Sequence, residues 1–313
     1  MKFNALPKIV TVSAIAALVL TGTAGCNRTS EASGETTKIV MALSTLNNPF
    51  FVDLRDGALA AAKSAGVQLD IVDAQNDSAT QANQLATAIT SNASAVIVNP
   101  VDSAAAGTSV TALNKANIPV IAVDRTVNDA KVASLVASDN VAGGAQAAVA
   151  LATSMGETGS VIMLQGVSGT SASRDRGEGF REGLKAFPNI QIVAAQTANF
   201  DRAEALDVTT NLMQANAGVT GIFAENDEMA LGAIQALGDR AGVDVMVAGF
   251  DGTSDGFDAI VAGTLYSTVA QQPAKLGQLA VEQALKAIKG ETVEAILPVE
   301  VVSVTKENVG DFS

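Results

Sequence analysis

The sequence predicts an α/β protein made of two similar, doubly wound parallel-sheet lobes. From residue 38 onward, short apolar runs alternate with Ala-rich stretches of helical length. The runs show little polar alternation, which is typical of parallel strands covered by helices on both faces. Two pairs of polar strand ends also recur with the same spacing and order, Asn99 with Asp124 and Asn226 with Asp251. This repetition indicates two related units, each an open sheet with right-handed crossovers.

The expected strands follow from runs that are rich in β-branched residues, which favour extended backbone. In chain order the runs are IVMALS (39–44), LDIVDA (69–74), AVIVNP (95–100), PVIAVD (119–124), VIMLQG (161–166), IQIVAA (190–195), GIFAEN (221–226), VMVAGF (245–250) and LYSTVA (265–270). Among the first four runs, helices are expected at 52–65, 78–90 and 103–116.

The N-terminus carries the features of an export signal. A basic start is followed by a short apolar run, residues 10–20, about half as long as the ~20 residues of a spanning helix. The residues before Cys26 resemble a lipobox, although Thr23 stands where Leu is usual. We expect a lipoprotein signal peptide at 1–25 and a flexible tether at 26–37, with Cys26 as the acylated residue. Ordinary signal cleavage with an incidental cysteine is the alternative.

Composition excludes several classes of function. The chain of 313 residues has a formal net charge of −13, one Cys and no His. Without His there is no Ser-His-Asp or Cys-His nucleophile and no imidazole metal site. A single Cys excludes an intrachain disulfide and a thiolate zinc cluster. The acidic balance argues against nucleic acid and anionic membranes as partners. We expect no metal, no cofactor and no enzyme activity.

Polar side chains gather at the expected strand ends, where parallel sheets bind ligands. They are Ser44, Asn99, Asp124, Arg125, Asn226, Asp251 and Gln271. Each one alone could be a turn former or a helix cap. Phe50, Phe51, Phe200 and Phe250 stand near these ends. Flat apolar rings beside hydrogen-bonding groups suit a monosaccharide, with the aspartates accepting from hydroxyls and with Arg125 and Arg176 donating.

Three features resemble enzyme sites, but the sequence supports none of them. The segment 252–256 matches G-x-S-x-G, but the chain has no His to serve as its base. The Gly-rich segment 166–170 lacks the phosphate-binding pattern. A glycosidase-like pair of Asp124 and Asp251 has no local support.

Five motifs resemble the D-ribose-binding subgroup of the type I periplasmic solute-binding proteins of sugar ABC importers. They are STLNNPFF (44–51), Asp124-Arg125, GTSASRDRGEGF (169–180), NDEMALGA (226–233) and GFDGT (249–253). The resemblance covers essentially all of residues 38–305. It implies that the sugar lies between phenylalanine rings, with Phe50 and Phe51 on one face and Phe200 on the other.

The resemblance also assigns roles to the polar residues. Hydrogen bonds to the sugar would come from Asn48, Asp124, Arg125, Arg176, Asn226, Asp251 and Gln271. Residues behind these, or in the wall of the site, would be Ser44, Asn99 and Phe250.

The same resemblance implies three strand crossovers, near 138–139, 271–273 and 298–299. The first lobe would comprise 38–138 plus 272–298, and the second 139–271 plus 299–313. Hinge closure on the sugar would create the form that a permease recognises.

The expected function is therefore that of an exported, lipid-anchored, monomeric substrate-binding protein that delivers D-ribose to an ABC permease from the periplasm or cell surface. Another monosaccharide (allose, xylose, galactose or a furanose signal) stays open as the ligand, as does sugar sensing through a chemoreceptor. A sugar-responsive repressor would need an N-terminal helix-turn-helix, where this chain has an export signal.

Overall fold

The computed structural model describes residues 37–312, which lie within one compact unit. The expected signal peptide at 1–25, Cys26 and nearly all of the tether lie outside the described residues. No helix within 37–312 is both long enough and apolar enough to cross a membrane.

The first sheet has six strands in the order β11-β5-β4-β3-β1-β2, all paired in parallel. The strands are β1 (Lys38–Leu43), β2 (Gln68–Asp73), β3 (Ala95–Val98), β4 (Val120–Val123), β5 (Ser134–Ser138) and β11 (Ile296–Val299).

The second sheet repeats this order as β12-β10-β9-β8-β6-β7 and is parallel except at one edge, where β12 runs antiparallel to β10. Its strands are β6 (Gly159–Gln165), β7 (Ile190–Thr197), β8 (Val219–Ala224), β9 (Met246–Asp251), β10 (Ser267–Ala270) and β12 (Val302–Thr305).

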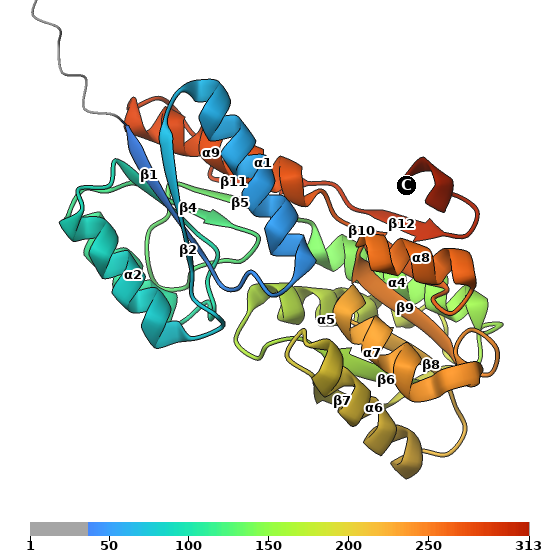
Figure 1. Cartoon of the computed structure of the whole chain (residues 1–313). Helices are drawn as coiled ribbons and strands as arrows, with labels where there is room; N and C mark the ends of the chain where they lie inside the picture. The colour runs from blue at the N-terminus through green and yellow to red at the C-terminus, as the bar shows by residue number, and fades with distance from the viewer. Residues whose placement is uncertain (1–36, 313) are drawn as a thin grey trace, which may run out of the picture. The chain divides into compact units, whose positions relative to one another are not determined.

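Helices cover both faces of each sheet (Figure 1). Around the first sheet lie α1 (Pro49–Ala65) and α9 (Pro273–Ile288) on one face, and α2 (Ser78–Thr90) and α3 (Ala106–Lys115) on the other. Around the second lie α4 (Asn140–Ser154) and α5 (Ser171–Leu184) on one face, and α6 (Arg202–Ala215), α7 (Asp227–Leu237) and α8 (Ser254–Ala262) on the other.

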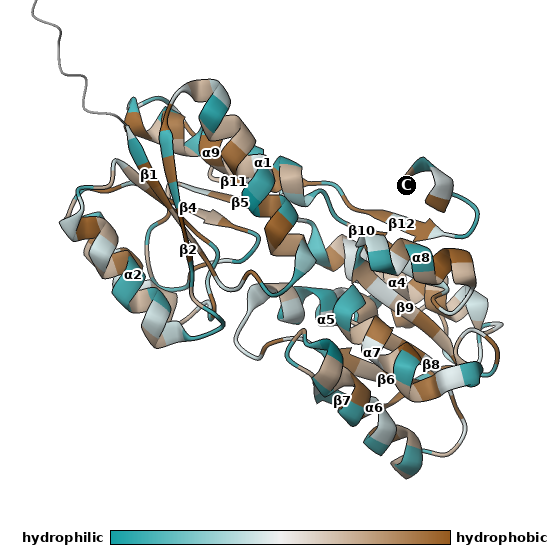
Figure 2. Ribbon diagram, in the orientation of Figure 1, coloured by the Kyte–Doolittle hydropathy of each residue, from teal (hydrophilic) through white to brown (hydrophobic). Residues whose placement is uncertain are grey.

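Strand β1 shows why this layering follows from the sequence. Its alternate residues Ile39 and Met41 pack toward α1 and α9, whereas Val40 and Ala42 pack toward α2 and α3. Successive side chains of a strand point to opposite faces, so a strand covered on both faces is apolar throughout. Figure 2 shows the result, since β1 and β9 are mostly hydrophobic while α2 alternates between hydrophobic and hydrophilic residues.

The fold class is confirmed: the protein has two similar α/β lobes with doubly wound parallel sheets. The chain passes from one sheet to the other after β5, after β10 and after β11. Three strands lie outside the expected runs: β5, β11 and β12. Strands β5 and β11 each precede a passage between the sheets, and β11 and β12 are edge strands. Helix α3 starts at Ala106 rather than at 103, because Asp102 accepts from the backbone N–H groups of Ala104 and Ala105 and holds a separate turn there.

Candidate functional site

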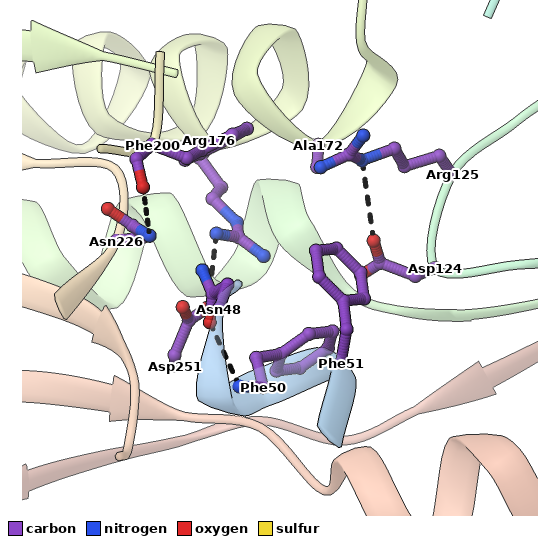
Figure 3. Close-up of a pocket in the computed structure, with 10 residues that line it drawn as sticks. All are labelled: Asn48, Phe50, Phe51, Asp124, Arg125, Ala172, Arg176, Phe200, Asn226 and Asp251. Atoms are coloured by element: carbon purple, nitrogen blue, oxygen red, sulfur yellow. Dashed lines mark hydrogen bonds and ion pairs between the residues drawn. The ribbon is translucent and has the colours of Figure 1, made fainter. Parts of the chain in front are cut away.

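A small cavity lies between the carboxyl ends of the two sheets, and Figure 3 shows the residues that line it. Its lining comes from both lobes and consists of Asn48, Phe50, Phe51, Asp124, Arg125, Ala172, Arg176, Phe200, Asn226 and Asp251. Ligand sites of this fold lie at these strand ends.

The start of α1 places two phenylalanine rings in the cavity wall. Asn48 caps the helix, with its Oδ1 accepting from the N–H of Phe50 at 2.9 Å, and Pro49 follows at the first helical position. Both residues suit a helix start, which fixes the first turn. The rings of Phe50 and Phe51 are buried and meet edge to face, with centroids 5.1 Å apart.

Asp124 and Arg125 follow strand β4 and are buried side by side. The amide of Asn99, at the end of the neighbouring strand β3, donates to Asp124 Oδ2 at 3.0 Å. Arg125 places its Nε 3.5 Å from the same oxygen, and its Nη1 donates to the carbonyl of Pro100. Asp124 Oδ1 and Arg125 Nε are buried without a hydrogen-bond partner in the described part of the chain. These two groups can therefore bond to a ligand at low cost.

Helix α5 holds Arg176 against the floor of the second lobe. Its Nε donates to Asn140 Oδ1 at 2.8 Å, and its Nη1 donates to the carbonyl of Glu225 at 2.7 Å. The guanidinium stacks 3.9 Å above the centre of the Phe250 ring and lies 3.3 Å from Asp251 Oδ1. These partners fix the donor fork in one orientation.

Phe200 and Asn226 complete the wall from the second lobe. Asn226 caps α7 by accepting from the N–H of Met229, and its own amide lies 3.4 Å from the carbonyl of Phe200. The Phe200 ring lies against Gly166, where a Cβ would come within 2.0 Å of the ring. A glycine is required at that position for the ring to stand where it does.

Burial sets the protonation of the charged groups. It raises the pKa of Asp124, even though Arg125 and Arg176 oppose the shift, and it raises the pKa of Asp251 to about 8. Burial also lowers the pKa of Arg125. Charged groups in a dry site need hydrogen-bond partners, and a polyhydroxylated ligand supplies them.

Nine of the ten expected ligand-contacting residues line this one cavity, from Asn48 to Asp251. The tenth, Gln271, is not among the lining residues but donates to Asp251 Oδ1 at 2.7 Å. The three expected supporting residues also lie at the site: Ser44 donates its N–H to Asn99, Asn99 bonds Asp124, and Phe250 lies beneath Arg176. Their roles toward a ligand stay predictions.

Sequence reasoning missed three residues of the site. Ala172 lines the cavity, but a small apolar side chain carries no chemical signal. Asn140 bonds Arg176 from the start of α4, far away in the sequence. Glu225 is buried and accepts from Ser173 Oγ and from the N–H of Gly166. Its place next to the strand-end residue Asn226 was the available signal. No cluster of three metal-binding side chains occurs within 37–312.

Comparison with known proteins extends these observations. The family described as periplasmic binding protein domain matches residues 39–292. The chain is 43% identical to the ribose import binding protein RbsB of Escherichia coli, over 94% of this chain and 97% of that protein. It is 44% identical to RbsB of Bacillus subtilis, over 82% of this chain and 83% of that protein.

A solved structure shows the same architecture. It is an ABC transporter periplasmic solute-binding protein from Actinobacillus succinogenes with bound D-allose. The two structures align with a TM-score of 0.83 and 32% sequence identity, over 88% of this chain and 100% of the other.

Proposed function

Because the chain belongs to the periplasmic sugar-binding proteins of ABC importers, we propose that its ligand is D-ribose, held in the cavity between the two lobes. The protein is a substrate-binding component of transport and not an enzyme. Asp124 Oδ1 carries the proposal, since it is a buried carboxylate oxygen without a hydrogen-bond partner in a residue of the cavity wall. A sugar hydroxyl is the donor that this oxygen lacks.

The remaining groups fit a pentose in the same way. Oδ1 of Asp251 accepts hydrogen bonds from Arg176 and Gln271, so the other carboxylate oxygen can accept from a second sugar hydroxyl. Phe51 and Phe200 come from different lobes and offer apolar faces to the C–H groups of the ring. The identity to the RbsB proteins favours ribose over other sugars.

D-Allose is the alternative ligand that a specific observation favours, because the solved relative from Actinobacillus succinogenes binds it. Allose is larger than ribose by one hydroxymethyl group.

We further propose that the lobes, residues 38–138 plus 272–298 and residues 139–271 plus 299–313, close on the sugar by bending at the three sheet-to-sheet passages. The closed monomer would present the sugar to a permease, with a chemoreceptor as a further partner. Membership of the family supports a periplasmic location, and Cys26 would provide the lipid anchor there.

A sugar panel tests the ligand. A ligand that binds only the folded state raises its apparent stability, by about 2.7 kcal/mol at one hundred times the dissociation constant. We expect D-ribose to raise the melting temperature more than allose, xylose or galactose at equal concentration, with titration calorimetry giving one site per chain. No heat with ribose, together with clear binding of another sugar, would refute the ribose assignment.

Two substitutions test the site. Asp124→Ala and Arg176→Ala each leave buried partners unpaired, which costs about 1–3 kcal/mol, or roughly a 5- to 160-fold loss of ribose affinity. Arg174→Ala is the matched control, since Arg174 lies on the same helix but is exposed and pairs with Asp175. Wild-type affinity in both site variants would show that the sugar binds elsewhere.

A further inference from the structure

Asp227 is a fully buried carboxylate next to the sugar cavity, whose lining includes its neighbour Asn226. Four donors converge on it. Its Oδ2 accepts from the N–H groups of Gly252 and Thr253, at 3.0 and 2.8 Å, and from Thr253 Oγ1. Its Oδ1 accepts from Thr268 Oγ1 at 2.7 Å. One side chain of α7 thereby connects the turn after β9 with strand β10.

The carboxylate of Asp227 is closely packed against the residues around it. A Cβ at Gly249 or at Gly256 would come within 2.4 Å of an oxygen of Asp227. Both positions lie on the elements that flank the turn, the strand β9 and the helix α8. The turn and the carboxylate therefore fit each other closely, and neither can shift alone.

The turn that Asp227 holds is the one that presents Asp251 to the cavity. Asp251 has a φ of 121° and Gly252 a φ of 75°, so a non-glycine residue stands in a region of φ that side chains disfavour. Such a conformation persists only where the surrounding structure enforces it. The two residues that follow Asp251 are bonded to Asp227, which supplies that constraint.

We propose that Asp227 is a positioning residue for sugar binding: it contacts no sugar, and it sets the direction of the Asp251 carboxylate by fixing the backbone of Gly252 and Thr253. This inference rests on the proposed function, because it concerns the affinity of the same cavity.

A double-mutant cycle tests the connection between the two aspartates. Asp227→Asn keeps the size of the side chain and removes the charge that strengthens its hydrogen bonds, so it should weaken ribose binding about tenfold. In an Asp251→Asn background the same change should lower the ribose affinity about twofold or less, because the effects of residues that act through one another are not additive. Equal losses in both backgrounds would overturn the proposal.

A second measurement needs no ligand. In the sugar-free protein, amide exchange at Gly252 and Thr253 should be faster in Asp227→Asn than in wild type. The matched control is Leu237→Ala at the far end of α7, which should lower the melting temperature but leave both amides and the ribose affinity unchanged. Unchanged exchange in Asp227→Asn would also overturn the proposal. If Asp227→Asn fails to fold, Thr268→Val is used in the same two experiments. This variant removes the donor to Asp227 Oδ1 and also an acceptor of the Gly252 N–H, so exchange is then read at Thr253 alone.

These outcomes separate the two proposals. If wild type does not bind ribose, the proposed ligand is wrong, and the cycle is run with the sugar that the panel identifies. If wild type binds ribose but the losses add, the ligand stands and the positioning role of Asp227 is wrong. The exchange experiment decides the positioning role even where no sugar of the panel binds.

Discussion

The charged residues of the site are buried, and they differ in how completely their polar atoms are hydrogen-bonded. Asp251 and Arg176 share donors and acceptors with each other and with Gln271, whereas Asp124 keeps one oxygen without a partner. Burying an unpaired polar atom costs on the order of 1–3 kcal/mol. A sugar hydroxyl that bonds to this oxygen removes that cost, which is a favourable contribution to affinity.

Glu225 makes the stability of the protein depend on pH. Burial raises its pKa from the ordinary value of 4.5 to about 7. Between these values the folded protein holds more protons than the unfolded chain, so the free energy of unfolding falls as pH rises toward 7. We expect Glu225→Gln to lose less stability than wild type between pH 5 and pH 7.5 in urea unfolding without sugar.

The control for this prediction is Asp258→Asn, an exposed acid on α8, which should follow the wild-type profile. Asp227 and Asp251 also have raised pKa values. The free energy of unfolding of Glu225→Gln should therefore still fall as pH rises, but less steeply than that of wild type. Superimposable profiles for wild type and Glu225→Gln would contradict the assignment.

Residue type and position together allowed most of the cavity lining to be predicted. Phe50, Asp124 and Asn226 stand at strand ends or helix starts, so the chain order alone brings them to the edge where parallel sheets bind ligands. The supporting contacts could not be predicted in this way. Asn140 reaches Arg176 only because two helices pack closely, and that packing depends on tertiary distances which no local pattern records.

At the scale of elements, each lobe contains two helices that pack against each other at a glycine. A Cβ at Gly144 of α4 would lie 2.2 Å from the carbonyl oxygen of Arg176 on α5. In the other lobe, a Cβ at Gly277 of α9 would lie 2.0 Å from the carbonyl oxygen of Leu54 on α1. The helix backbones approach closely in both pairs, and in the second lobe this approach sets the depth of Arg176.

Gly144→Ala should therefore separate α4 from α5. Because the neighbouring atoms belong to backbone and cannot rotate away, we expect a loss of about 1–3 kcal/mol in the free energy of unfolding. Ribose affinity should fall with it, since Arg176 lies at the contact. Urea unfolding and calorimetry measure the two effects. Val149→Ala, on the exposed side of the same helix, should change neither by more than about 0.5 kcal/mol.

The elements that sequence patterns missed have a common physical reason. Strand β5 alternates buried and half-buried residues, and β11 contains Pro298 and alternates exposed residues with half-buried or buried ones. A proline in a strand is confined to sheet edges, and β11 is an edge strand. Strands of this kind lack the continuous apolar run by which the central strands could be recognised.

At the scale of the whole described molecule, hydrogen bonds outside the cavity also join the lobes. The N–H of Ser103 donates to the carbonyl of Gly169, and the N–H of Ser171 donates to Ser103 Oγ at 3.3 Å. The N–H of Thr126 donates to Ser171 Oγ at 2.9 Å. These bonds connect loops of the first lobe with the start of α5 in the second.

If the lobes close on the sugar as proposed, these bonds exist only in the closed form. Ser171→Ala should then weaken ribose binding by about 0.5–1.5 kcal/mol, or roughly 2- to 13-fold, and leave the melting temperature of the sugar-free protein unchanged. Ser254→Ala, at the first residue of α8, is the control. Equal affinities of Ser171→Ala and wild type would show that this contact does not stabilise the closed form.

The three passages between the sheets have a further consequence for the order in which the protein can be built. During synthesis from the N-terminus, β1 to β5 emerge first, but α9 and the edge strand β11 that complete their lobe come only after residue 272. Until then one face of the first sheet is covered by α1 alone, without α9 over β3, β4 and β5, and β5 presents an open edge, which invites pairing with other chains. Neither lobe can finish folding before nearly the whole chain is available, so a chaperone that holds the growing chain would protect this protein more than one built from two consecutive domains.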